Sequence, residues 1–127
     1  MIQAIRAWIE RDPAAQTGWL GALQDRQIGR AIGLIHRDPA RDWSLVSLAE
    51  AAAMSRSAFA ARFTALVGEP AMQYLTRWRM NLALGWLQEG DVAIAALAER
   101  LGYQSEAAFS RAFKRCHGVS PGAIRRA

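Results

Sequence analysis

Two stretches of the chain carry the residue types most able to recognise another molecule, and they repeat one pattern fifty residues apart. The segments read "SRSAFAARFTALVG" at 55–68 and "SEAAFSRAFKRCHG" at 105–118. In each segment the phenylalanines are four residues apart, so they predict one inward helix face used for packing. The opposite face carries Arg, Ser and Ala. Small residues allow a helix to approach a nucleic-acid groove closely, and Arg or Ser can reach base edges and phosphates.

We therefore expect a DNA-binding face on each repeated helix. In the first copy the candidates are Arg56, Ser57, Ala60, Ala61 and Arg62. In the second copy they are Glu106, Ala107, Ser110, Arg111 and Lys114. Arg111 is the strongest single candidate for a base contact, because guanidinium forks pair with guanine edges. The alanines leave little direct readout, so DNA shape and contacts to thymine methyl groups are expected to add specificity.

The charge distribution favours the same half of the chain. Residues 1–50 hold six Arg and six acidic residues, whereas residues 51–127 hold nine Arg, Lys114 and five acidic residues. The whole net charge of +5 therefore lies with the repeat. A general preference for Arg codons would explain Arg over Lys, but it would not explain this concentration. A basic half is typical of a protein that binds phosphate-rich partners.

The elements that must position these faces are predicted to be helices, because long alternating β-branched runs are missing. N-caps and glycine stops place them, from N-terminus to C-terminus, at 26–37 (cap Asp25), 45–53 (cap Ser44), 56–67 (cap Ser55, stop Gly68), 70–88 (opened by Pro70), 92–101 (cap Asp91), 106–117 (cap Ser105, stop Gly118) and a short helix from Ser120-Pro121. Two apolar stripes predict core faces, one of Ile28, Ala31, Ile32 and Ile35 and one of Leu75, Trp78, Leu82 and Trp86. A further short helix is expected at the N-terminus, with Ile2, Ile5, Trp8 and Ile9 as its stripe and residues 14–24 as a connector.

Short helix, tight turn and capped second helix form a helix-turn-helix pattern, and the chain carries it twice. "LAE" opens each copy, and the second turn ("GYQS" against "AMS") holds one extra residue. The helix between the copies spans about 28 Å at 1.5 Å per residue. With the width of the flanking helices, the two second helices are expected about one DNA turn, roughly 34 Å, apart. One monomer would then reach two successive major grooves.

These residues resemble the DNA-binding domain of the AraC/XylS family of bacterial transcription regulators, over about residues 26–126. The run "GYQSEAAFSRAFKRCHGVSPG" carries the resemblance most specifically. The resemblance implies an all-α domain over 25–127, with helix-turn-helix units near 45–67 and 92–117 joined by a linker helix near 70–88. It implies base-facing positions at Ser57, Ala60, Ala61, Glu106, Ala107, Ser110 and Arg111. It further implies that Lys114, Arg77 and Arg79 serve phosphates or intramolecular pairs.

Two positions depart from the family pattern. Family members commonly carry Arg where this chain has Ala61, and that loss could cost about 1–3 kcal/mol of discrimination at one base. Arg62 lies about 100° further round the helix, so it is expected to reach a phosphate rather than a base. Ala53 replaces a glycine often found in the first turn. We expect either a different backbone angle there or some strain.

Family members usually carry a separate sensing domain, often of the cupin type, and this chain has neither the strands nor the length for one. Residues 1–24 are interpreted as the tail of such a domain. A piece of a longer protein and a natural stand-alone chain both stay open. We expect no small-molecule effector site and no cofactor in this chain.

A protein-interaction module and an enzyme are the two alternative classes of function. A protein-interaction module would use the helix-turn-helix units to dock RNA polymerase, or residues 2–9 for weak self-association. An enzyme would need a catalytic constellation, and none can be assembled from the motifs present. Cys116 beside His117 lacks the further ligands of a zinc site, so it is interpreted as an ordinary helix residue. No stretch has the length of a membrane span, and a cytoplasmic, nucleoid-associated location is expected.

Overall fold

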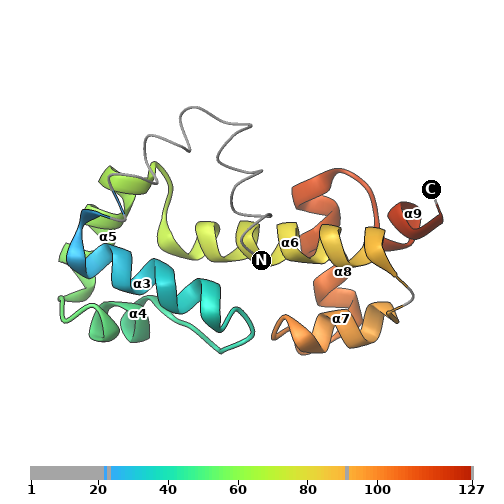
Figure 1. Cartoon of the computed structure of the whole chain (residues 1–127), viewed down its shortest axis with the longest axis horizontal. Coiled ribbons are helices and arrows are strands. Elements are labelled where there is room, and N and C mark those ends of the chain that lie inside the picture. Colours follow the sequence, from blue (N-terminus) through green and yellow to red (C-terminus); the bar gives the residue numbers. More distant parts are fainter. Residues whose placement is uncertain (1–21, 23, 91, 127) are drawn as a thin grey trace. The chain divides into compact units, whose positions relative to one another are not determined.

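A computed structural model gives the structure of the chain and describes residues 22, 24–90 and 92–126 (Figure 1). The helices with defined bounds are α3 (Arg26–Arg37), α4 (Leu45–Ala51), α5 (Arg56–Val67), α6 (Ala71–Glu89), α7 (Ile94–Arg100), α8 (Glu106–His117) and α9 (Pro121–Arg126). No strand occurs among the described residues, which confirms the predicted all-α class. The expected helix at residues 2–9 lies outside the described part.

The chain divides into two units. The described residues 22, 24–38 and 43–75 form the first unit, and residues 39–42 with 76–126, apart from residue 91, form the second. The first unit holds α3, α4, α5 and the start of α6, and the second holds the rest of α6 with α7, α8 and α9. A four-residue segment between α3 and α4 therefore belongs to the second unit rather than to the helices it joins.

In the first unit, α3 packs against both α4 and α5. Its N-terminus is fixed by Asp25, whose side chain accepts hydrogen bonds from the backbone N–H groups of Gln27 and Ile28 at 3.0 and 2.9 Å. The predicted apolar stripe of α3 is buried, as shown by Ile28, Ala31, Ile32 and Ile35. This burial supplies the apolar surface that holds a short helix in place, since isolated helices of this length are marginal in water.

The inward face of α5 contributes two aromatic rings to the same core. Phe59 and Phe63 are fully buried, with ring centroids 5.7 Å apart. Phe63 also meets Tyr74 edge-on at 5.7 Å. The prediction that these phenylalanines pack rather than bind is confirmed, and it fixes which face of α5 is left for another molecule.

The second unit repeats this arrangement around α8, which packs against α7 and α9. Phe109 and Phe113 are fully buried with centroids 5.9 Å apart, and Tyr103 meets Phe109 edge-on at 5.7 Å. Leu97 within α7 (Ile94–Arg100) and Leu101 at its C-cap are fully buried as well. Both repeated helices are thus anchored by the same pair of aromatic positions.

Three predicted helices have ends that differ from the structure, including the end of α7, which lies at Arg100 rather than at residue 101. Helix α4 ends at Ala51 rather than at residue 53, because the next residues form a left-handed turn. Helix α7 begins at Ile94 rather than at residue 92, and its N-cap is Ala93, which makes no side-chain cap hydrogen bond. The predicted capping residue Asp91 itself lies outside the described part. The linker helix runs over Ala71–Glu89, one residue later at each end than predicted.

The core stripe of α6 is confirmed for Leu75, Trp78 and Leu82, which are 1, 4 and 6% exposed. Trp86, the fourth residue of the predicted stripe, is only half-buried. The guanidinium carbon of Arg100 lies over its ring, 5.0 Å from the ring centroid. None of the described helices combines the length and apolar character that crossing a bilayer requires.

Candidate nucleic-acid interface

The outward face of α5 is set by its cap and its buried phenylalanines. Ser55 accepts a hydrogen bond from the backbone N–H of Ala58 at 3.2 Å, which begins the helix at the predicted residue. Gly68 ends it in the left-handed conformation with φ of 94°. The predicted contact residues all lie on this helix, where Arg56, Ser57, Ala61 and Arg62 are exposed and Ala60 is half-buried.

Helix α8 presents the equivalent face in the second unit. Ser105 caps it by accepting from the Ala108 N–H at 3.0 Å, and Gly118 ends it with φ of 81°. The predicted residues again share one helix, where Glu106, Ala107, Arg111 and Lys114 are exposed and Ser110 is half-buried. Each unit therefore brings its own five candidates together on one helix.

The two faces have different chemistry at matched positions. Arg111 and Lys114 on α8 correspond to Ala61 and Thr64 on α5, at the fifty-residue offset. Within the described residues neither Arg111 nor Lys114 forms an ion pair, so both cations point charge into solvent. At these two matched positions α8 therefore offers two positive charges to phosphate or base acceptors, and α5 offers none.

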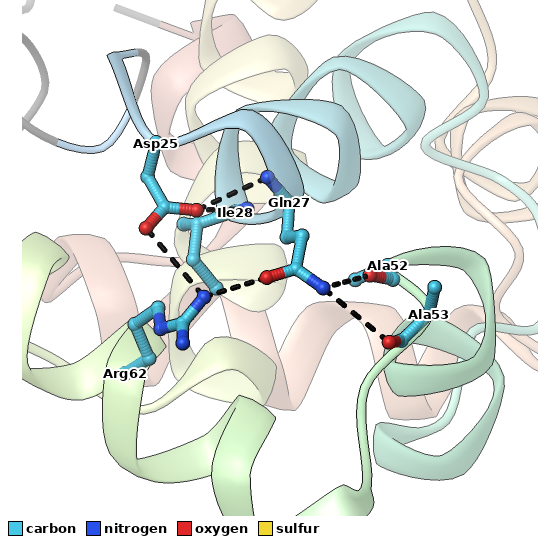
Figure 2. A network of polar contacts seen from close by, with 6 residues as sticks. All are labelled: Asp25, Gln27, Ile28, Ala52, Ala53 and Arg62. Carbon is cyan, nitrogen blue, oxygen red and sulfur yellow. Dashed lines mark hydrogen bonds and ion pairs between the residues drawn. The ribbon is translucent and has the colours of Figure 1, made fainter.

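Arg62 is the one predicted contact residue whose side chain has polar partners in the described part of the chain (Figure 2). Its Nη1 donates to Oε1 of Gln27 at 2.7 Å and lies 3.8 Å from Oδ2 of Asp25. The Arg62 side chain is still 44% exposed. Sequence reasoning placed Arg62 near a phosphate and missed these partners, because they precede it by 35 and 37 residues.

The first helix of each pair ends with the same pattern of backbone hydrogen bonds. In the first turn, the N–H of Ala53 donates to the Glu50 carbonyl at 3.0 Å and that of Met54 to the Ala49 carbonyl at 2.9 Å. In the second turn, Gly102 and Tyr103 make the equivalent bonds to Glu99 and Ala98 at 3.0 and 2.9 Å. This pair of bonds is the Schellman ending of a helix, which needs one left-handed residue.

That left-handed residue is Gly102 in the second turn, with φ of 84°, and Ala53 in the first, with φ of 57°. Of the two alternatives left open by the sequence, the backbone keeps the left-handed angle and accepts the strain. The turn is supported from α3, since Nε2 of Gln27 donates to the carbonyls of Ala52 and Ala53 at 3.1 and 3.3 Å (Figure 2).

Arg79 makes intramolecular contacts, which is one of the two roles predicted for it, the other being phosphate binding. Its Nε donates to the Pro39 carbonyl at 2.7 Å and its Nη2 to the Arg41 carbonyl at 2.9 Å, while its guanidinium lies 5.8 Å from the Tyr103 ring centroid. Burial lowers the pKa of Arg79, and Tyr103 acts in the opposite direction. The side chain thus ties the segment 39–42 and the second turn to α6.

The two histidines and the cysteine are not assembled into a metal site. Within the described residues no group of three or more His, Cys, Asp or Glu is placed to hold a metal ion. His36 Nε2 lies 2.5 Å from the Tyr74 hydroxyl, and His117 Nε2 lies 3.0 Å from the Met80 carbonyl oxygen. Burial lowers the pKa of His36 to about 4, so the ring is neutral at pH 7. Cys116 is exposed on α8.

Comparison with known proteins identifies the family. A family model described as "Helix-turn-helix domain" matches residues 48–127, and relatives of this chain are named AraC-like transcription regulators. The chain belongs to the AraC-type family of helix-turn-helix domains. The AraC-type assignment confirms the resemblance read from the repeated segments, and the family and its named relatives are regulators rather than enzymes.

Among sequence relatives, an AraC-like regulator of Streptomyces lividans is 47% identical over 126 residues, which cover 99% of this AraC-type chain and 41% of that protein. One of Streptomyces antibioticus is 48% identical, covering 99% of this chain and 42% of the relative. The HTH-type transcriptional regulator AlkR of Acinetobacter baylyi is 40% identical, covering 87 and 38%. The chain therefore spans about two fifths of the length of these curated relatives.

Solved structures agree with the AraC-type assignment. The C-terminal domain of AraT, a response regulator from Geobacillus stearothermophilus, matches with a TM-score of 0.74 and 29% identity, over 80% of this chain and 84% of that one. The DNA-binding domain of AdpA, a global transcriptional factor solved in complex with a target DNA, matches with a TM-score of 0.73 and 29% identity, over 80 and 91%.

Proposed function

We propose that this chain binds double-stranded promoter DNA sequence-specifically, as the DNA-binding part of a bacterial transcription regulator. The observation that carries the proposal is the matched pair of outward helix faces on α5 and α8. Each face has a serine cap, a preceding helix that ends with the same backbone hydrogen bonds, and the same buried pair of phenylalanines. Similarity to the AdpA domain, whose structure includes a target DNA, supports the same function for this AraC-type chain.

The proposed contacts divide by chemistry. The proposed base-facing positions are Ser57, Ala60, Ala61, Glu106, Ala107, Ser110 and Arg111. Phosphate positions are Arg56, Arg62 and Lys114, whose charges would release counterions from the DNA. Phosphate contacts carry affinity and base contacts carry selectivity, so the two sets predict different mutant behaviour.

The test compares Arg111→Ala with Lys114→Ala on a duplex selected from a random pool and on a shuffled duplex, by fluorescence anisotropy. Arg111→Ala should cost about 1–3 kcal/mol on the selected duplex and little on the shuffled one. Lys114→Ala should weaken binding to both equally and lower the salt dependence by about one ion. Equal losses on both duplexes for both variants would remove Arg111 from the base-reading set, and no preference by the wild type would refute specific binding.

The same proposal covers the bounds of the DNA-binding domain, its location and its further partners. Residues 25–127 would form the DNA-binding domain, and the chain would act on the nucleoid in the cytoplasm, with RNA polymerase as a second partner. Self-association through residues 2–9 is the alternative use of the N-terminal segment. Deletion of residues 1–24 should leave DNA affinity unchanged, and loss of self-association in that variant would assign the segment to dimer contact.

A further inference from the structure

We propose that Gln27 is a positioning residue for the first recognition helix, where it orients Arg62 toward the DNA backbone and fixes the turn that leads into α5. The inference rests on the DNA binding proposed above and assigns a role to α3, a helix that carries none of the predicted contact residues. Its basis is the polar network shown in Figure 2.

The first arm of the network holds Arg62. Gln27 Oε1 accepts from the Nη1 group of Arg62 at 2.7 Å, and the Asp25 carboxylate lies 3.8 Å from the same nitrogen. The other carboxylate oxygen of Asp25 is committed to the N-terminus of α3, where it accepts two backbone N–H groups. Gln27 is therefore the closer partner of the guanidinium, and Asp25 adds charge that favours the same orientation.

This orientation leaves Arg62 able to bind a phosphate. A guanidinium has five N–H donors, and the contacts within the described residues use only the Nη1 nitrogen. The Nε and Nη2 donors remain, on a side chain that is 44% exposed. A planar fork that is already held in place loses less conformational freedom when it pairs with a phosphate. Gln27 thus prepares the contact without competing for it.

The second arm holds the turn before α5. Nε2 of Gln27 donates to the carbonyls of Ala52 and Ala53, and Ala53 is the one described non-glycine residue with positive φ. The second turn has Gly102 at the matched position and needs no such support against side-chain strain. The amide therefore reinforces the turn whose residue type fits its backbone least. Because binding groups must be held within about 0.5 Å, this support also bears on where α5 lies.

The experiment measures binding of the full chain to two selected duplexes at 25 °C. One duplex is intact, and the other has the block read by α5 scrambled, which is the block whose preference survives Arg111→Ala. Gln27→Met removes both arms and keeps the side-chain length. Gln73→Met is the matched control, because Gln73 is exposed on α6 and its side chain makes no hydrogen bond within the described residues.

We expect Gln27→Met to weaken binding to both duplexes about fivefold, the size of one hydrogen bond, and to make binding less dependent on salt, because the phosphate contact of Arg62 does not depend on sequence. Gln73→Met should match the wild type on both. Unchanged affinity of Gln27→Met on both duplexes, even with a lowered Tm, would overturn the inference, as would an unchanged salt dependence of binding. A wild type that fails to distinguish the duplexes would instead refute the proposed function.

Discussion

The second helix-turn-helix turn is built so closely against a neighbouring backbone that one added methyl group should disrupt it. A Cβ atom on Gly102 would lie 2.4 Å from the carbonyl oxygen of Ala40 and 3.1 Å from its carbonyl carbon. Both atoms are backbone, and they cannot turn aside as a flexible side chain could. Gly102→Ala must therefore shift the segment 39–42 or the turn itself.

The magnitude follows from two contributions. A non-glycine residue in the left-handed conformation costs about 1–2 kcal/mol, and reduced freedom of the unfolded chain returns about 0.4–1 kcal/mol of that. Displacing the segment 39–42 also weakens the Arg79 bonds to the Pro39 and Arg41 carbonyls, at 2.7 and 2.9 Å. Each hydrogen bond from a charged group contributes about 1.5–3 kcal/mol. If about one of them is lost, Gly102→Ala should lower the free energy of unfolding by roughly 3 kcal/mol in total.

Urea unfolding followed by circular dichroism would measure this loss, with Gly118→Ala as the matched control. Gly118 has φ of 81°, but a Cβ there meets nothing within 4 Å, so only the conformational cost of about 1 kcal/mol should appear. Ala53→Gly is the reciprocal change and should stabilise the first unit by about 0.5–1 kcal/mol. Equal losses for Gly102→Ala and Gly118→Ala would refute the role assigned to the Ala40 contact.

Other predictions concern buried polar groups in each unit. Burial lowers the pKa of His36 from an ordinary value near 6.5 to about 4, so the unfolded chain binds more protons between these values. The contribution of His36 to the free energy of unfolding should be fully present above pH 6.5. It should fall by at most about 3 kcal/mol as the pH drops toward 4. His36→Gln should remove this pH dependence in unfolding titrations. Arg79→Lys should destabilise the second unit by about 1–3 kcal/mol in urea, because one ammonium cannot reproduce a planar fork on two carbonyls. The exposed Arg125→Lys should change stability by less than about 0.5 kcal/mol, and a similar loss for both variants would count against the Arg79 contacts.

The ends of a helix could be predicted from the sequence where they depend on local chemistry. Ser55, Ser105, Gly68 and Gly118 act within one turn of their own helix, so the caps and stops could be predicted from residue type alone. The predicted start of α7 at residue 92 was wrong, because the helix begins at Ile94 with Ala93 as its N-cap. Capping chemistry does not decide between neighbouring starts when packing sets the helix.

Contacts between distant parts of the chain could not be predicted in the same way. Gln27 reaches Arg62 across 35 residues and the first turn across 25 and 26. Arg79 reaches back 40 residues to Pro39. No local pattern encodes these pairs, because they depend on how helices pack. The one related signal in the sequence was Ala53 in a position that favours glycine, which predicted either a different backbone angle or some strain in that turn.

The central claim is that both repeated helices read DNA, and selection of binding sites from a random duplex pool at about 0.15 M salt tests it most directly. Non-specific phosphate binding is weak at that salt, so enrichment reports base and shape readout. We expect a motif with two information-rich blocks about ten base pairs apart, one for each of α5 and α8. A single block, or no enriched motif from properly folded protein, would contradict it.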